Sequence, residues 1–293
     1  MRKILVLGGT NYFGKKLVQR LLKNDDRVTL ATRESHDDGF GMQVDRLKID
    51  REDKQSMMTA FEGKNWDLVY DQSCLASQEA WDAAKALKEK CSRYIFTSTQ
   101  AVYEFGTNHR EENFDPMSFT YRLKKRAEYQ GYEGYQEAKR AAEAVLFQQG
   151  YFKIAAVRMP IVVSQDDYTE RLKFYVDKIK QSNPIVIEDP KFRYSFIHAE
   201  EAAEFLFQLG NSDFTGSINP GCSEDISLDE LVQKIGRIVE RKPLIQSNQT
   251  GDKGSPYALP GSWSVHTGKA KSLGLSFSKL DEVLDPLIRS FQK

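Results

Sequence analysis

Three tyrosines are each followed four residues later by a lysine, in the pairs Tyr12 and Lys16, Tyr121 and Lys125, and Tyr135 and Lys139. On a helix this spacing places a phenol beside an ammonium, and the cation lowers the pKa of the tyrosine by stabilising the phenolate. Such a pair can exchange a proton with a substrate hydroxyl or carbonyl. Tyr12 lies in a glycine-rich turn and Tyr121 in a polar stretch, whereas Tyr135 opens an amphipathic helix predicted over residues 135–149. Tyr135 and Lys139 are therefore the candidate catalytic pair; the alternative is an exposed tyrosine beside an unrelated lysine.

A pair of hydroxyl residues ends the apolar strand that we predict over residues 94–98. Open α/β sheets bind their ligands at the carboxyl ends of the strands, which is where Thr99 is expected to lie. Thr99 is therefore the candidate third catalytic group. The alternative is a strand-end hydroxyl that caps a turn.

A glycine-rich turn connects the strand predicted over residues 3–7 to the helix predicted over residues 13–23. Glycine permits a tight turn and lets backbone N–H groups approach a pyrophosphate at the helix N-terminus. Asn11 stands in place of the middle glycine of the usual motif, and asparagine tolerates left-handed backbone angles, so we expect the turn to survive. The predicted cofactor-binding residues of this turn are Gly8, Thr10, Asn11, Tyr12, Phe13 and Gly14. An ordinary strand-to-helix turn is the alternative.

An arginine follows the second predicted strand, which covers residues 27–32. An acidic residue at this place binds the ribose of NAD, whereas a basic residue accommodates the extra phosphate of NADP. Arg33 therefore favours NADP; NAD is the alternative, because Glu34 is adjacent. Asp50, after the third strand, is a candidate contact to the adenine edge or else an exposed strand-end aspartate.

These residues need a doubly wound parallel sheet to bring them together, and the first half of the chain has the matching alternation of strands and helices. The predicted strands cover residues 3–7, 27–32, 47–49, 68–70, 94–98 and 153–158, and the predicted helices cover residues 13–23, 54–61, 78–90 and 135–149. We predict an α/β, Rossmann-type domain over residues 1–160 that binds NAD(P). We predict a smaller α/β substrate lobe over residues 161–293. Interleaving of some of its strands with the first domain is allowed by this prediction.

After Arg158 the pattern changes to helices separated by loops that contain proline and glycine. Ser227 and Glu230 form a capping-box signature for a helix over residues 228–240, and a final amphipathic helix is predicted over residues 280–291. The stretch from residue 106 to residue 131 is polar and charged, which predicts a surface excursion.

Four motifs in this order resemble the extended short-chain dehydrogenase/reductase superfamily, of the NAD-dependent epimerase/dehydratase type with an atypical Gly-Gly-Thr loop. The motifs are Ser98-Thr99-x-x-Val102-Tyr103, Tyr135-x-x-x-Lys139 with Glu143, Arg158-Met159-Pro160, and Phe196-Ile197-His198. The resemblance implies that Tyr135 is the general acid/base, that Lys139 holds the nicotinamide ribose and tunes the tyrosine, and that Thr99 hydrogen-bonds the reacting oxygen. It also implies that the segment containing Pro160 lines the nicotinamide.

The chain departs from the sugar-nucleotide members of that family at positions that bind diphosphate. Where these members commonly have arginines, this chain has Tyr194 before the Ile-His motif and Thr250 before Gly251-Asp252. The resemblance therefore predicts an NAD(P)-dependent oxidoreductase, like an epimerase or dehydratase, that transfers hydride to or from a hydroxyl or carbonyl of a small polar metabolite, with a sugar nucleotide among the candidates. The alternatives are an isoflavone-reductase-like enzyme and a non-catalytic NAD(P)-sensing or RNA-associated binding protein of the same fold.

Composition narrows the possible partners. Lys plus Arg equals Asp plus Glu at 42 each, so no overall field attracts nucleic acid or an anionic membrane, and neither partner is expected. The four histidines lack metal-ligand spacing, and the three cysteines, Cys74, Cys91 and Cys222, are widely separated, as in reduced cytosolic proteins. The apolar start of the chain is too short for a signal peptide. We expect a cytoplasmic enzyme without metal, for which the resemblance allows a homodimer.

Overall fold

The computed structural model describes residues 1–35, 37–246, 255–257 and 259–292. These residues form two compact units, the first made of Met1–Val102, Glu111–Met159 and Ala202–Ile218, and the second made of Tyr103–Arg110, Pro160–Glu201 and Asn219–Lys293. The division differs from a single boundary after residue 160, because residues 103–110 join the second unit and residues 202–218 join the first. Both exceptions contain strands that pair with segments distant in sequence.

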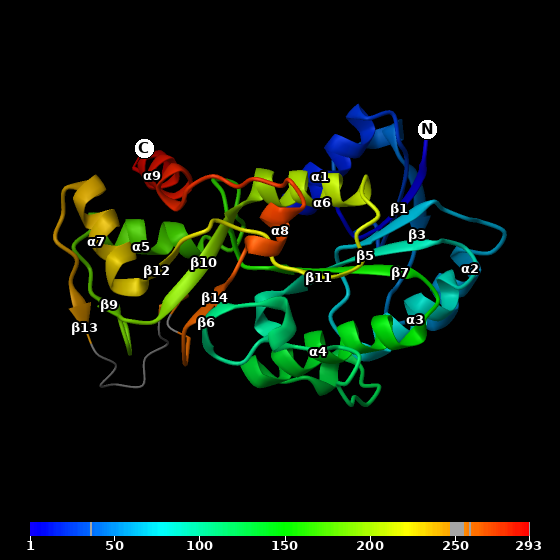
Figure 1. Ribbon diagram of the computed structural model, residues 1–293. Helices are drawn as coiled ribbons and strands as arrows, with labels where there is room; N and C mark the ends of the chain where they lie inside the picture. The colour runs from blue at the N-terminus through cyan, green and yellow to red at the C-terminus, as the bar shows by residue number, and fades with distance from the viewer. Residues whose placement is uncertain (36, 247–254, 258, 293) are drawn as a thin grey trace. The chain divides into compact units, whose positions relative to one another are not determined.

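Seven parallel strands form the central sheet of the first unit, in the order β11-β7-β5-β4-β1-β2-β3 (Figure 1). They are β1 (Lys3–Leu7), β2 (Arg27–Thr32), β3 (Asp45–Lys48), β4 (Leu68–Asp71), β5 (Arg93–Thr99), β7 (Lys153–Met159) and β11 (Gly216–Ile218). The chain adds β2 and β3 on one side of β1 and then β4, β5 and β7 on the other. This doubly wound α/β fold confirms the prediction, and ligands of such sheets bind at the carboxyl ends of the strands, where the order reverses.

Helices cover both faces of this sheet. Helices α1 (Tyr12–Lys23) and α6 (Ala199–Gly210) lie on one face, and α2 (Lys54–Ala60), α3 (Ser77–Leu87) and α4 (Gly131–Gln149) lie on the other (Figure 1). The core under α2, α3 and α4 contains Leu5, Val69, Phe96 and Val145. Strands β1 and β4 are buried almost throughout, as expected for parallel strands that are covered on both faces.

The second unit contains a mixed sheet, in keeping with the predicted α/β lobe, but its individual strands were not predicted. Its path is β12-β10-β14-β6, and β8 also pairs with β10; a separate pair joins β9 and β13. The strands are β6 (Gly106–His109), β8 (Ile161–Val163), β9 (Ile185–Val186), β10 (Arg193–His198), β12 (Asp225–Ser227), β13 (Ile245–Gln246) and β14 (Trp263–Val265). The predicted polar surface excursion over residues 106–131 begins as a strand, β6, whose two middle residues are exposed and which pairs with β14.

The helices of the second unit agree with the sequence prediction better than its strands do. They are α5 (Arg171–Lys180), α7 (Leu228–Val239), α8 (Gly268–Ser272) and α9 (Leu280–Ser290). The predicted capping box at the start of α7 is confirmed: the Ser227 hydroxyl accepts a hydrogen bond from the Glu230 N–H at 3.1 Å, and the Glu230 carboxylate accepts one from the Ser227 N–H at 2.8 Å.

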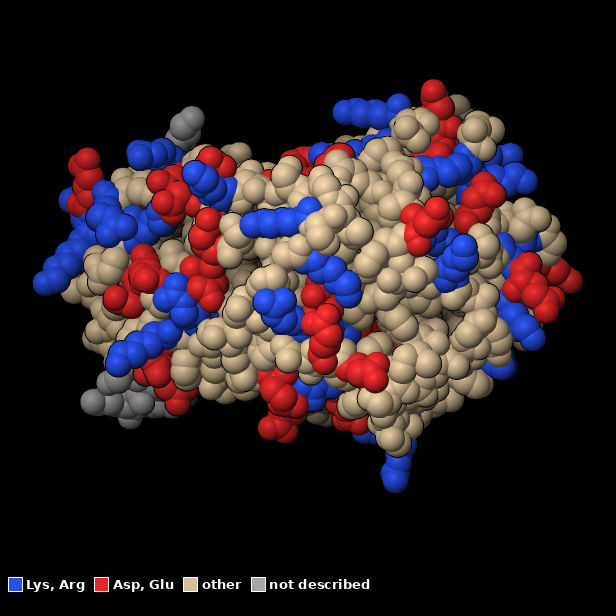
Figure 2. All heavy atoms as spheres, in the orientation of Figure 1, with Lys and Arg blue, Asp and Glu red and all other residues tan. Residues whose placement is uncertain are grey.

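Basic and acidic side chains alternate over the face of the molecule drawn in Figure 2. No broad single-sign stripe crosses this face, in keeping with the equal numbers of acidic and basic residues. Within the described ranges, no helix has both the length and the apolar character needed to span a membrane.

Candidate active site

The turn after β1 is shaped by its glycines. Gly8 and Gly9 have φ angles of +87° and +76°, which disfavour residues with a Cβ atom. A Cβ on Gly9 would lie 2.5 Å from the Val6 Cγ1 atom, and a Cβ on Gly14 would lie 3.1 Å from the Gly9 Cα atom. The first turn of α1 thus packs directly against the end of β1, as a dinucleotide cradle requires.

Asn11 corrects one part of the sequence prediction. Asn11 is the N-cap of α1 and has an extended backbone with a φ of −129°, whereas the left-handed residue is Tyr12, with a φ of 52°. The turn survives as expected, but its left-handed residue is Tyr12, because Asn11 is extended at the N-cap position. The Asn11 side chain makes no capping hydrogen bond, and the first turn of α1 has no acidic residue. This helix start is suited to an anionic ligand.

The remaining residues of the turn flank this helix start. Thr10 directly precedes the N-cap, and the Phe13 ring meets the Tyr12 ring edge-on at a centroid distance of 5.7 Å. Beyond the turn, Arg33 is exposed after β2 and forms no ion pair with any described residue. Asp50 is exposed and accepts a hydrogen bond from the Glu52 N–H at 3.0 Å, which is the local turn contact weighed as its alternative.

Lys139 is the most tightly positioned of the three predicted catalytic residues. It is buried on α4, where its ammonium donates hydrogen bonds to the Thr97 carbonyl at 2.9 Å and the Cys74 carbonyl at 3.0 Å. The ammonium also lies 4.4 Å from the centroid of the Phe96 ring. Burial lowers the pKa of Lys139 below its ordinary value. Because an ammonium has three donors, one remains for a ligand.

The structure brings Lys139 against β5 two residues before Thr99. Thr99 is partly exposed at the end of β5, and its hydroxyl oxygen accepts a hydrogen bond from the Ala101 N–H at 3.2 Å. Tyr135 lies one helical turn before Lys139 on α4 and is 41% exposed. Tyr121, in contrast, lies outside any helix, so its spacing to Lys125 does not place the two on one helix face.

Sequence reasoning missed the buried ion pair that holds this region together. The Arg51 guanidinium donates to both carboxylate oxygens of Asp71, at 2.9 Å for the Nη2–Oδ2 contact, and the Tyr94 hydroxyl donates to the same carboxylate. Asp71 also accepts hydrogen bonds from the N–H groups of Ser73 and Cys74, at 3.2 and 3.1 Å. Asp71 therefore fixes the loop whose Cys74 carbonyl holds Lys139. The sequence signal for this ion pair was Asp71 at the end of the apolar strand β4, because a buried carboxylate needs a partner.

A second buried network corrects the resemblance at Arg158. Arg158 and Glu143 are fully buried and pair at 2.8 Å, and the Ser98 hydroxyl donates to Glu143. The Arg158 guanidinium also donates to the carbonyls of Glu111 and Phe114, at 2.8 and 2.9 Å. Arg158 is therefore a structural residue that joins β7 to α4. Pro160 follows β7 as the first residue of the second unit, and its predicted contact with nicotinamide stays a prediction.

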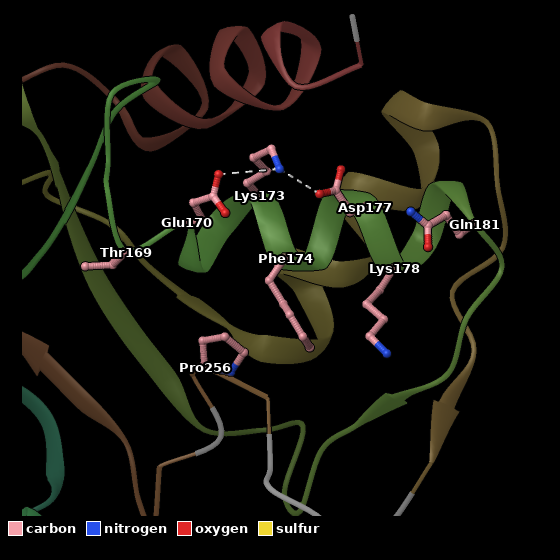
Figure 3. A pocket seen from close by; sticks show the side chains of 8 residues that line it. All are labelled: Thr169, Glu170, Lys173, Phe174, Asp177, Lys178, Gln181 and Pro256. Carbon is pink, nitrogen blue, oxygen red and sulfur yellow. Dashed lines mark hydrogen bonds and ion pairs between the residues drawn. The ribbon is translucent and has the colours of Figure 1, made fainter.

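The second unit carries a pocket of about 330 Å³ along α5 (Figure 3). Lys173 forms ion pairs with Glu170 at 3.6 Å and Asp177 at 3.0 Å, while Phe174 and Lys178 point toward the side where Pro256 lies (Figure 3). Elsewhere in this unit, Arg193 pairs with Asp225 at 2.7 Å and Glu230 at 3.0 Å. Because those carboxylates engage its guanidinium, Arg193 would have to give up an ion pair in order to bind a diphosphate.

The described residues contain no group of three His, Cys, Asp or Glu side chains that could hold a metal ion. His198 accepts a hydrogen bond from the Glu200 N–H at 3.3 Å through Nδ1. The buried Cys74 and Cys222 and the partly buried Cys91 are free thiols. Burial raises the pKa of Cys222 and of Cys91 to about 12, which makes both thiols poor nucleophiles.

Comparisons with known proteins agree with the fold. The chain is 25% identical over 281 residues to chloroplast stem-loop binding protein of 41 kDa b from Arabidopsis thaliana, covering 88% of this chain and 70% of the relative. The crystal structure of Thermus thermophilus UDP-glucose 4-epimerase with NAD superposes with a TM-score of 0.71 at 17% identity, over 99% of each chain. Pal from Bacillus thuringiensis superposes with a TM-score of 0.75 at 20% identity, over 99% of this chain and 98% of Pal.

The family comparison concerns the N-terminal part of the chain. Residues 4–86 match the NAD dependent epimerase/dehydratase family, and this range contains the glycine turn, nearly all of β1, β2 to β4 and most of α3. The chain is thus similar to this family over its N-terminal part, and the solved structures agree with it in fold.

Proposed function

We propose that this chain is an NAD(P)-dependent oxidoreductase or epimerase that moves hydride to or from a hydroxyl or carbonyl of a small polar metabolite. The observation that carries the proposal is the buried Lys139 ammonium, held by two backbone carbonyls between β5 and α4. An ammonium in this position has a donor left for a ribose hydroxyl and a charge that favours the Tyr135 phenolate.

The cradle fits a dinucleotide. The glycine turn leaves no room for additional Cβ atoms between β1 and α1, and the start of α1 has neither a capping side chain nor an acidic residue. The turn from Gly8 to Gly14 would hold the pyrophosphate, and Lys139 the nicotinamide ribose. We propose NADP as the preferred cofactor, because Arg33 is exposed beside the end of β2 and no described carboxylate pairs with it.

Three residues of the chain would carry the proton chemistry. Tyr135 would give or take the proton at the substrate oxygen, and the Lys139 charge would stabilise the phenolate formed in that exchange. The Thr99 hydroxyl accepts a hydrogen bond from the Ala101 N–H, so its own proton remains available for a hydrogen bond to the substrate oxygen. When bound, the nicotinamide supplies the hydride acceptor or donor.

The substrate class that we propose is a small polar metabolite, with UDP-glucose as the first sugar nucleotide to test because it is named for a structural neighbour. Because the Arg193 guanidinium is already paired with Asp225 and Glu230, we favour a substrate whose binding does not require Arg193 as a diphosphate ligand.

The first experiment identifies the nucleotide and then tests turnover. Mass spectrometry of nucleotides released from freshly purified, denatured protein separates retained NAD from an empty site, and titration of emptied protein with NADH and NADPH ranks the two cofactors. Tyr135→Phe should lower kcat by roughly 10²–10⁴-fold and leave dinucleotide affinity nearly unchanged. Tyr121→Phe is the matched control, since Tyr121 shares the spacing to lysine but lies outside a helix. Full turnover by Tyr135→Phe would exclude the catalytic assignment.

A binding protein without turnover is the second candidate. It is favoured by the name of the Arabidopsis relative, which describes stem-loop binding, and by the engaged Arg193. This candidate predicts salt-sensitive binding of an RNA stem-loop at physiological ionic strength. The balanced charge of the chain and the positioned Lys139 favour the enzyme.

A further inference from the structure

A second polar pocket, of about 420 Å³, opens at the amino ends of β1, β2 and β3 in the first unit, the opposite end of these strands from the glycine turn. Its lining comes from the three strand starts and from the turn before β4, and comprises Lys3, Arg27, Thr29, Asp45, Arg46, Leu47, Gly63, Lys64, Asn65 and Trp66. This volume is sufficient for a ligand of the size of a sugar phosphate.

Sheet register places the charges of this pocket on one face. Lys3 pairs with Arg27, and Thr29 pairs with Asp45, in parallel register. Paired residues point to the same face and every second residue along a strand does so too, so Lys3, Arg27 and Asp45 share the face of Thr29. Trp66 bounds the pocket on this face, where it is buried and donates a hydrogen bond to the Thr29 hydroxyl at 3.3 Å.

The charges of this pocket do not balance internally. Arg27 uses Nε to pair with Asp45 at 2.7 Å, and its two Nη groups make no hydrogen bond to a described residue. Neither the Lys3 nor the Lys64 ammonium forms an ion pair within the described part of the chain. Arg46, at the rim, is already paired with Asp38 at 2.8 Å. Within the lining, Lys3, Arg27 and Lys64 face the single carboxylate of Asp45, which leaves a surplus of two positive charges among the lining side chains. The Asp67 carboxylate, which is not part of the lining, accepts a hydrogen bond from the Lys3 N–H at 2.7 Å.

We propose that this pocket binds a phosphate monoester, as a ligand site separate from the dinucleotide cradle. A phosphate dianion matches the surplus of two charges, and the available Nη groups of Arg27 offer the paired donors that phosphate oxygens accept. Lys3 and Lys64 supply the remaining point charges, and the Asn65 amide supplies a neutral donor. A concave pocket among acidic neighbours suits a small ligand better than the continuous phosphate chain of a nucleic acid.

Isothermal titration of the full chain with inorganic phosphate and with glucose 6-phosphate tests the proposal, with and without saturating NADPH. The expected result is saturable 1:1 binding that NADPH does not abolish, because the glycine turn is a separate site. The double variant Lys3→Gln/Lys64→Gln should weaken binding at least tenfold, whereas Lys242→Gln, an exposed lysine of the second unit, should not change it. Unchanged unfolding midpoints verify that both variants fold.

Three outcomes would overturn this assignment. Equal binding by the wild type and the double variant would exclude these lysines, and loss of binding in NADPH would place the phosphate in the glycine turn. Displacement of phosphate by an RNA stem-loop, with loss of RNA binding in the double variant, would assign the surface to nucleic acid instead. None of these outcomes depends on turnover, so failure of the proposed enzymatic function is recognised separately.

Discussion

The ion pairs at the two ends of the parallel sheet in the first unit differ in burial. At the carboxyl end, Arg51 and Asp71 form an ion pair whose side chains are 9% and 0% exposed. At the amino end, Arg27 and Asp45 form a pair whose side chains are 57% and 49% exposed. Burial fixes the geometry of the first pair and makes it costly to break, whereas water screens the second pair and leaves it able to exchange partners. The fixed geometry at the carboxyl end suits the proposed catalytic site, and the exchangeable ion pair at the amino end suits the proposed phosphate site.

Breaking the buried pair should have the largest effect. Arg51→Met leaves the Asp71 carboxylate buried without its cation, so we expect a loss of about 3–5 kcal/mol in the free energy of unfolding. Urea-induced unfolding measures this loss. The loop that carries Cys74 should loosen with it, and dinucleotide affinity should fall in parallel. A loss below about 1 kcal/mol, the level of a surface pair, would mean that burial does not distinguish the two ends.

Because Lys139 is buried at the carboxyl end of the sheet, the free energy of unfolding should depend on pH through this residue. Burial lowers its pKa in the folded protein, so the unfolded chain binds more protons between that lowered pKa and about 10.4, the unperturbed value. Stability contributed through Lys139 must therefore rise with pH across this window. The free energy of unfolding of the wild type should rise relative to that of Lys139→Met between pH 7 and pH 10, because a tenfold difference in proton affinity between the folded and unfolded states corresponds to about 1.4 kcal/mol. A constant difference between the two proteins would show that Lys139 titrates normally.

Two helix starts at the carboxyl end sharpen the comparison. Asp53 caps α2 by accepting a hydrogen bond from the Gln55 N–H at 2.9 Å, whereas Asn11 makes no such bond at the start of α1. Asp53→Ala should lower the free energy of unfolding by about 1 kcal/mol, and Asn11→Ala by a few tenths at most. Thermal unfolding of both variants, without added nucleotide, tests whether the α1 start is reserved for a ligand. Equal losses would contradict that interpretation.

The exposed pair should give the smallest effect. Arg27→Gln removes the partner of Asp45, and we expect a small decrease in the urea midpoint, well below that of Arg51→Met, which disappears in high salt. Urea unfolding at low and high ionic strength measures it, with Arg51→Met as the internal reference. A salt-independent loss would indicate that the amino end is as enclosed as the carboxyl end.

The sequence predicted the first unit well because its strands and helices are long enough to show their periodicity. The apolar run before Gly8 and the amphipathic face of α4 each indicate one element and one direction of burial. The strands of the second unit were missed because β8, β12 and β14 have three residues each and pair with distant segments. Three residues are too few for a period of two to be recognised.

At the candidate site, residue types were predictable and contacts were not. The spacing of Tyr135 and Lys139 and the position of Thr99 after the apolar part of β5 could be read from the chain. The partners of Lys139 are backbone carbonyls, which no side-chain pattern reveals. Arg51 and Asp71 lie twenty residues apart on separate segments, so only the folded sheet joins them.

The return of residues 202–218 to the first unit determines how that unit can be made. Strand β11 completes the sheet beside β7, and α6 supplies the Leu206 and Leu209 carbonyls that accept hydrogen bonds from Tyr70 and Arg93, at 3.1 and 3.0 Å. A nascent chain that ends at residue 159 therefore has β7 as an open edge of the sheet and lacks the protein partners of these two donors. The first unit is therefore completed only after residue 218 has been synthesised, and an expression fragment designed to isolate this unit must retain residues 202–218.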